Sequence, residues 1–254
     1  MTIPLLEARH VTKRFSGITA LDDISLEVAD HEFVAMIGPN GAGKTTFFNC
    51  LTGVLTPEQG TVRFGDADLL SMPTYRRARL GLARTFQRIE LFAGTTVRDH
   101  LLVAERARTR NGGLLRDLTG RSAPQPEERE RCDAVLDLIG LMPLAEYPIE
   151  SLSLGKGRLV ELARALMCQP RLLFLDEPSS GLDIAETHEM ATVLETVQRE
   201  QGTAILLVEH DVPLVERLAG RTYVLDVGRL LAAGPTSEVL ADADVRAAYL
   251  GQGV

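Results

Sequence analysis

The chain has 254 residues, which is enough for one substantial α/β core or for a core with a subdomain. Its formal net charge of −8 argues against a nucleic-acid partner, because general nucleic-acid binders are usually basic. The three cysteines are scattered and indicate reduced thiols of a cytosolic protein, while the sequence lacks a signal peptide and any run of about 18 apolar residues. Any role at a membrane therefore requires a partner.

Short runs along the chain predict two kinds of β-structure. Residues 5–35 alternate apolar and polar positions and, with Gly60–Gly65, predict a small antiparallel sheet. The runs Phe33–Ile37, Leu172–Leu175 and Ala204–Val208 are apolar on both faces, as strands of a covered parallel sheet are. Helical patterns separate these runs, which predicts a doubly wound core.

The middle of the chain differs from its two ends. Residues 98–167 contain no convincing strand and several amphipathic helical stretches, one of them Glu127–Ile139. A polar, basic piece between residues 111 and 126 predicts a surface loop or a short helix. Near the C-terminus, Tyr223–Leu225 reads as a strand and the turn residues 226–229 predict a final hairpin.

A phosphate-binding loop follows the first apolar strand. The G-x-x-x-x-G-K-[ST] pattern lies between Phe33–Ile37 and a segment that can wind as a helix, so backbone N–H groups and the helix dipole can hold phosphates. Lys44 can reach the β- and γ-phosphates, and the Thr45 hydroxyl can bind Mg²⁺. The loop, which predicts binding of a nucleoside triphosphate, consists of Gly38, Pro39, Asn40, Gly41, Ala42, Gly43, Lys44, Thr45 and Thr46.

Two carboxylates follow the buried strand Leu172–Leu175. An apolar strand that ends in Asp176 and Glu177 is the expected second half of a P-loop site. Asp176 would hold Mg²⁺, and Glu177 would orient and polarise the attacking water. The alternative is a surface pair of acidic residues without a catalytic role.

Four further motifs resemble those of ATP-binding cassette (ABC) ATPases. Leu152–Arg158 is similar to the LSGGQ signature, and Ser180–Asp183 is similar to the D-loop. His210 matches the switch histidine, and Gln87 matches the Q-loop glutamine. The motifs occur in the family's order over nearly the whole chain. The resemblance implies an α/β P-loop NTPase core with a mostly parallel sheet, an N-terminal antiparallel β subdomain and an inserted α-helical subdomain.

The resemblance also implies boundaries and an assembly. One nucleotide-binding domain would span residues 1–254, with the core and β subdomain at about 1–86 and 168–254 and the helical subdomain at about 87–167. Two such domains, identical or different, would pack head to tail with ATP between them. Glu177, His210, Gln87 and Lys44 would then be catalytic. The Mg²⁺ ligands would be Thr45, Gln87 and Asp176, and the nucleotide would also contact Ser153, Gly155 and Asp183.

Single residues of these motifs have simpler interpretations. His210 alone is more often structural or exposed, and Ser153 alone suits a helix N-cap. Phe15 matches the aromatic position that stacks on adenine in the family, but it also suits the core of the N-terminal sheet. Lys156 stands where the family signature usually has Gln, so it either approaches the partner's γ-phosphate or faces solvent.

Finer similarity indicates an importer. Several segments resemble those of the ATP-binding subunits of branched-chain amino acid uptake systems. They are Gly81–Gln87, residues 91–92, residues 96–97 and the ending 249–251. Such a subunit would work at the cytoplasmic face of the membrane with permease subunits, fed indirectly by a solute-binding protein. Residues 87–97 would receive the permease, with Ile89, Leu91 and Phe92 forming either its groove or part of the core. A lipid or polysaccharide exporter and a soluble non-transport ABC ATPase are the alternatives.

Overall fold

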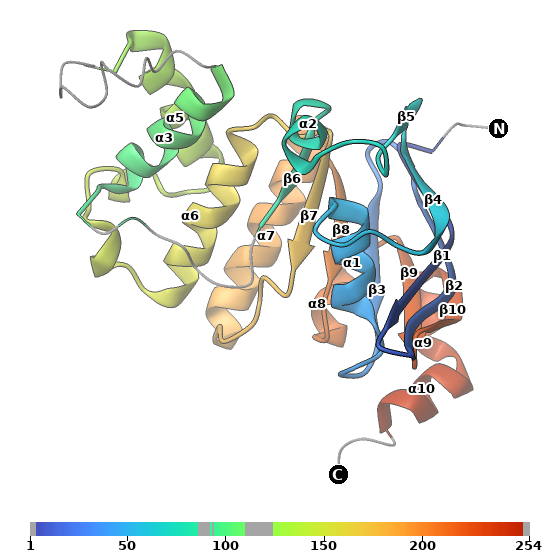
Figure 1. Cartoon of the computed structure of the whole chain (residues 1–254). Coiled ribbons are helices and arrows are strands. Elements are labelled where there is room, and N and C mark those ends of the chain that lie inside the picture. Colours follow the sequence, from blue (N-terminus) through green and yellow to red (C-terminus); the bar gives the residue numbers. More distant parts are fainter. Residues whose placement is uncertain (1–3, 86–91, 93, 110–123, 251–254) are drawn as a thin grey trace.

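A computed structural model describes residues 4–85, 92, 94–109 and 124–250 (Figure 1). A small antiparallel sheet lies at the N-terminal end of the chain, as the sequence predicts, and is joined on one side of the molecule to a larger sheet. In the order β2-β1-β4-β5, its strands are β2 (Ile18–Val28), β1 (Leu6–Phe15), β4 (Gln59–Phe64) and β5 (Ala67–Asp68).

The larger sheet is mostly parallel. Strands β6, β7, β8, β3 and β9 run parallel to one another, and β10 pairs antiparallel with β9 to form the predicted hairpin. In the order β10-β9-β3-β8-β7-β6, its strands are β10 (Arg229–Pro235), β9 (Arg221–Asp226), β3 (Phe33–Ile37), β8 (Ala204–Val208), β7 (Leu172–Asp176) and β6 (Leu82–Arg84).

Helices cover this sheet and form the middle of the chain. Two short 3₁₀ turns, Met142–Leu144 and Ile149–Ser151, connect helices in the middle region. Among the described residues, no helix combines the length and apolar character needed to cross a bilayer. The helices are α1 (Lys44–Thr52), α2 (Thr74–Arg79), α3 (Val97–Thr109), α5 (Pro126–Leu138), α6 (Leu154–Leu166), α7 (Ile184–Gln201), α8 (Val212–Leu218), α9 (Thr236–Ala241) and α10 (Ala243–Leu250).

The large sheet separates two hydrophobic cores. On β3, Ala35 and Ile37 belong to the core shared with the helices of the middle region. Their neighbours Val34 and Met36 belong to the core under the small sheet, together with Phe47 of α1. Both faces of the sheet are therefore buried, and the strands read as continuous apolar runs for that reason. The carboxyl ends of β3, β8 and β7 meet at one edge, so the loops that follow them are neighbours.

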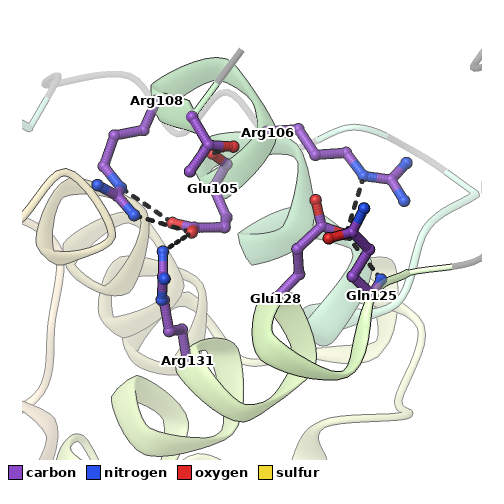
Figure 2. Close-up of polar contacts among 7 residues, drawn as sticks. Glu105, Arg106, Arg108, Gln125, Glu128 and Arg131 are labelled. Carbon is purple, nitrogen blue, oxygen red and sulfur yellow. Dashed lines mark hydrogen bonds and ion pairs between the residues drawn. The ribbon is translucent and has the colours of Figure 1, made fainter. Parts of the chain in front are cut away.

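The predicted helical insertion contains α3, α5 and α6. A buried carboxylate, Glu105, joins the first two helices (Figure 2). It accepts hydrogen bonds from Arg108 Nε at 3.0 Å and from Arg131 Nη1 at 2.5 Å. Burial alone would raise the pKa of Glu105, but its hydrogen bonds with Arg108 and Arg131 outweigh burial and lower it. The predicted surface piece between residues 111 and 126 lies almost entirely outside the described residues.

Candidate active site

Packing fixes both ends of the loop between β3 and α1. Gly38 and Gly43 have φ angles of +154° and +104°. A Cβ atom on Gly38 would lie 2.2 Å from the carbonyl oxygen of Leu225 in β9, and one on Gly43 would lie 2.8 Å from that of Ala20 in β2. Backbone atoms of the neighbouring strands cannot move aside cheaply, so both positions require glycine. The neighbouring strands therefore shape the loop.

Lys44 points back into this loop. Its side chain is buried, and Nζ donates hydrogen bonds to the carbonyl oxygens of Gly38 at 2.6 Å and Pro39 at 3.1 Å. Burial lowers the pKa of Lys44, while the nearby charges of Glu177 and Asp176 oppose that shift. The structure therefore brings together the lysine and the two carboxylates that the sequence predicts for one site.

The rest of the loop leads to the N-terminal end of α1. Asn40 and Gly41 are exposed at its tip, whereas Ala42 is buried. Thr45 is exposed and Thr46 is half-buried in the first helical turn. The first N–H groups of an α-helix have no intrahelical partner, and the helix dipole adds positive potential there. This end of α1 is therefore suited to phosphate oxygens.

The two predicted carboxylates differ in their environment. Asp176 is the last residue of β7 and is 2% exposed. Glu177 is half-buried and has a φ angle of +48°, and its backbone N–H donates to the carbonyl of Val208 at the end of β8. A non-glycine residue in this conformation costs about 1–3 kcal/mol, and such strain concentrates at functional sites. With this positive φ angle, the backbone at Glu177 leaves the extended direction that it has at Asp176.

Asp176 has the features of a metal ligand. Arg84 Nη2 lies 3.4 Å from its Oδ2, and burial raises the pKa of Asp176 even though Arg84 opposes that shift. Its other oxygen, Oδ1, is buried and has no hydrogen-bond partner among the described residues. A buried carboxylate oxygen of this kind is an oxygen donor that suits Mg²⁺. The residues present therefore fit the ion, with the Thr45 hydroxyl as a second donor.

The signature residues lie at the start of α6, which Figure 1 shows well separated from α1. Ser153 is the N-cap of α6, and its Oγ accepts from the backbone N–H of Lys156 at 3.3 Å. Gly155 is buried in the first turn. Asp183 caps α7 in the same way, because its carboxylate accepts from the backbone N–H of Glu186 at 2.8 Å. The N-cap interpretation of Ser153 is therefore correct, and it leaves a further role open.

Lys156 has a partner within its own chain. Its Nζ donates to Glu189 Oε1 of α7 at 2.6 Å, and the lysine side chain is 31% exposed. The residue is therefore neither simply solvated nor unpaired. The contact with Glu189 is the one that Lys156 makes within a single chain, and its approach to the γ-phosphate of the other subunit stays a prediction.

His210 and Phe15 both have exposed side chains. His210 follows β8, and its Nδ1 lies 3.6 Å from Glu209 Oε2. Phe15 ends β1 with 43% of its surface exposed, so the core interpretation of this residue is wrong. Lys13 Nζ lies 5.2 Å from the centre of its ring. The exposed ring of Phe15 is suited to stacking on a base, because every base has a π-face.

The predicted Q-loop and permease groove fall largely outside the described part of the chain. Gln87, Ile89 and Leu91 all lie outside the described residues. Phe92 is described and is 49% exposed. Its ring centre lies 5.0 Å from that of buried His100. Phe92 is therefore a surface aromatic residue that rests on the helical region.

Glu209 is a site residue that the sequence reasoning missed. It is fully buried directly after β8, and Oε1 accepts from the backbone N–H of Ser179 at 3.0 Å and from its hydroxyl at 2.5 Å. Oε2 accepts from the backbone N–H groups of His210 at 2.9 Å and Asp211 at 3.3 Å. One carboxylate thus joins the loop after β7 to the loop after β8. The available signal was an acidic residue between an apolar strand and His210.

We expect Glu209→Gln to destabilise the protein by about 2 kcal/mol or more. Both oxygens of Glu209 face N–H or O–H donors, so the glutamine NH₂ group would oppose one set of them and leave buried groups unsatisfied. Urea denaturation without nucleotide measures the change in the free energy of unfolding. Glu216→Gln, on an exposed position of α8, is the control and should stay within about 0.5 kcal/mol. Equal losses in the two variants would contradict the bridging role.

Comparison with known proteins places the chain in a family. Residues 21–180 match the family described as ABC transporter. The chain is 41% identical to the high-affinity branched-chain amino acid transport ATP-binding protein LivG of Salmonella typhimurium, covering 99% of this chain and 100% of LivG. It is 37% identical, with the same coverage, to BraF of Pseudomonas aeruginosa, a protein described in the same words.

Solved structures agree with this assignment. The ADP conformation of an ATP-binding cassette of an ABC transporter superposes with a TM-score of 0.86 at 28% identity, over 99% of this chain and 100% of that one. The sheet order and the helical insertion described above are therefore those of an ATP-binding cassette, and the fold predicted from the sequence is confirmed. This chain belongs to the ABC transporter family and is an ATPase of that family.

Proposed function

We propose that this chain is the ATP-hydrolysing subunit of an importer for branched-chain amino acids. The observation that carries the proposal is the similarity to LivG along the full length of both chains. The subunit would be membrane-associated through permease subunits and would lie on the cytoplasmic face. A solute-binding protein would deliver the amino acid to the permease and would contact the ATPase only indirectly.

In the proposed site, the triphosphate of ATP lies over the P-loop. Lys44 contacts its β- and γ-phosphates, and Thr45, Asp176 and Gln87 would hold Mg²⁺. The ion, when bound, neutralises charge that develops on the phosphate oxygens. Asp176 Oδ1 supports this assignment, because it is a buried carboxylate oxygen without a hydrogen-bond partner among the described residues.

Hydrolysis then requires a positioned water. Glu177 accepts a hydrogen bond from that water, whose oxygen attacks the γ-phosphorus while the bond to the β–γ bridging oxygen breaks. ADP and inorganic phosphate result. His210 contacts the γ-phosphate, and Glu209 positions the two loops that carry Glu177 and His210. The strained backbone of Glu177 supports this role.

A second ABC ATPase subunit, identical or different, completes each site. Ser153 and Gly155 at the start of α6 of one subunit donate to the γ-phosphate of the ATP held by the P-loop of the other. Asp183 also faces that ATP, and Phe15 stacks on adenine. The separation of α6 from α1 within one chain supports this arrangement. The proposed domain division has a core and β subdomain at about 1–86 and 168–254 and a helical subdomain at about 87–167, which would bind the permease.

Reconstitution of the transporter tests the proposed function. The chain, its permease subunits and the solute-binding protein are assembled in proteoliposomes, with ATP on the side of the ATPase. We expect uptake of labelled leucine, isoleucine and valine to depend on ATP, and ATP turnover to rise when an amino acid and the binding protein are present.

A Glu177→Gln complex serves as the matched control and should show neither uptake nor stimulated turnover. An active wild-type ATPase whose turnover ignores these amino acids would contradict the proposed substrate class. Stimulation by a lipid or a saccharide intermediate would instead support the exporter alternative.

A further inference from the structure

A carboxylate of the chain itself rests on the start of the signature helix. Glu186, in the first turn of α7, places Oε1 3.0 Å from Ser153 Oγ and 3.2 Å from the backbone nitrogen of Gly155. The hydroxyl and the N–H group both donate to this one oxygen. These two donors belong to α6, so the contact joins residues that are more than thirty positions apart in the sequence.

Packing holds this carboxylate close to the helix. A Cβ atom on Gly155 would lie 2.6 Å from Glu186 Cδ and 2.7 Å from its Oε1. The absence of a side chain at Gly155 thus makes room for the carboxylate. Negative charge is favoured at this position, because the N-terminal end of a helix carries partial positive charge.

The same two donors have only one proton each to give. Ser153 Oγ–H and Gly155 N–H are both committed to Glu186 in this structure. The proposed function assigns these groups to the γ-phosphate of the ATP held by the other subunit. The Glu186 carboxylate and a γ-phosphate cannot both accept these two protons at full strength. Two negative charges within hydrogen-bond distance of the same donors also repel each other.

We propose that Glu186 is a further residue of the composite nucleotide site, an internal carboxylate that occupies the γ-phosphate donors and must leave when ATP closes the dimer. The inference rests on the proposed function, because that function assigns the donors to ATP. Glu186 thereby raises the concentration of ATP needed for dimerisation. Its departure releases the start of α6 from the start of α7.

The capping role of Glu186 is separable from this competition. In the capping box of α7, its Oε2 accepts from the backbone N–H of Asp183 at 3.4 Å, which is longer than either contact with α6. Glutamine at this position also completes a capping box. A glutamine has only one carbonyl oxygen. When that oxygen accepts from the Asp183 N–H, the NH₂ group faces Ser153 Oγ and the Gly155 N–H and cannot accept from either of them. Glu186→Gln therefore keeps the cap, removes the negative charge and releases the two donors.

The test compares dimerisation in a background that hydrolyses ATP slowly. Glu177→Gln protein is titrated with ATP, and the dimer fraction is measured by multi-angle light scattering. We expect the added Glu186→Gln change to lower the ATP concentration at half-maximal dimer by about tenfold. A gain of dimer cannot result from misfolding. Binding of a fluorescent ATP analogue to the dilute monomer should be unchanged, because Glu186 contacts α6 and not the P-loop.

Glu195→Gln, also added to Glu177→Gln, is the matched control. It removes one carboxylate from the same helix about 13 Å further along the axis, beyond the screening length at physiological salt. Its ATP requirement should match that of the parent protein. An equal shift in both variants, or an unchanged or higher ATP requirement with Glu186→Gln, overturns the inference and leaves the proposed function intact. A parent protein that dimerises with ATP neither alone nor with a second ABC ATPase subunit would overturn both.

Discussion

Replacing Glu177 by glutamine is expected to reduce ATP turnover by roughly 10²–10⁴-fold while ATP binding is retained. The glutamine side chain has nearly the same shape but no longer supplies the carboxylate that polarises the attacking water. The protein should then accumulate as an ATP-bound dimer, because hydrolysis is the step that releases it. Phosphate release measures turnover, and size exclusion with light scattering measures the dimer.

Glu216→Gln is a suitable control for that experiment, because it neutralises an exposed glutamate of α8. Its turnover should equal that of the wild type. Near-normal turnover in the Glu177→Gln protein would remove Glu177 from its proposed role. The strained backbone at this position would then need another explanation.

The second large effect is expected from Lys44→Ala, which should weaken nucleotide binding and abolish turnover together. Lys44 is held inside the loop by the carbonyls of Gly38 and Pro39, and its charge would be replaced by a methyl group. Loss of a charge-assisted contact corresponds to about a tenfold to hundredfold loss of affinity. Titration with a fluorescent ATP analogue measures the affinity, and circular dichroism verifies that the variant is folded.

Lys156→Gln provides the matched control for the loss of one cation. Lys156 is paired with Glu189 at the start of the signature helix, away from the P-loop of its own chain. The affinity of the monomer for the analogue should therefore be unchanged in this variant. An unchanged affinity in the Lys44→Ala protein would show that the loop is not the nucleotide site.

The parts of the fold that depend on local pattern were predictable from the sequence. Strands β3 and β8 have the bounds that their apolar runs predict, because both faces of each strand are buried. Strand β6 was not predicted. It has three residues, which is too short for a period to be recognised, and it pairs with β7 by a contact that only the folded chain makes.

The same distinction applies to the candidate site. Lys44, Asp176 and Glu177 were found because motifs with fixed spacing mark them. Glu209 and Glu186 were missed, since each acts on groups about thirty residues away, and no local pattern specifies which donors a carboxylate will meet in the folded chain. Long-range polar contacts of this kind need the coordinates.

The position of Gly38 against β9 affects how mutations in this motif should be interpreted. Any side chain at Gly38 would collide with the carbonyl of Leu225, so the harm arises in the interior and would exist in a protein that never met a nucleotide. Gly41, in contrast, has open space where a Cβ would be. Loss of activity therefore has different causes at these two glycines of one motif. A substitution at Gly38 prevents correct folding of the interior. A substitution at Gly41 forces an L-residue into a backbone conformation that it rarely adopts, at the exposed tip of the loop.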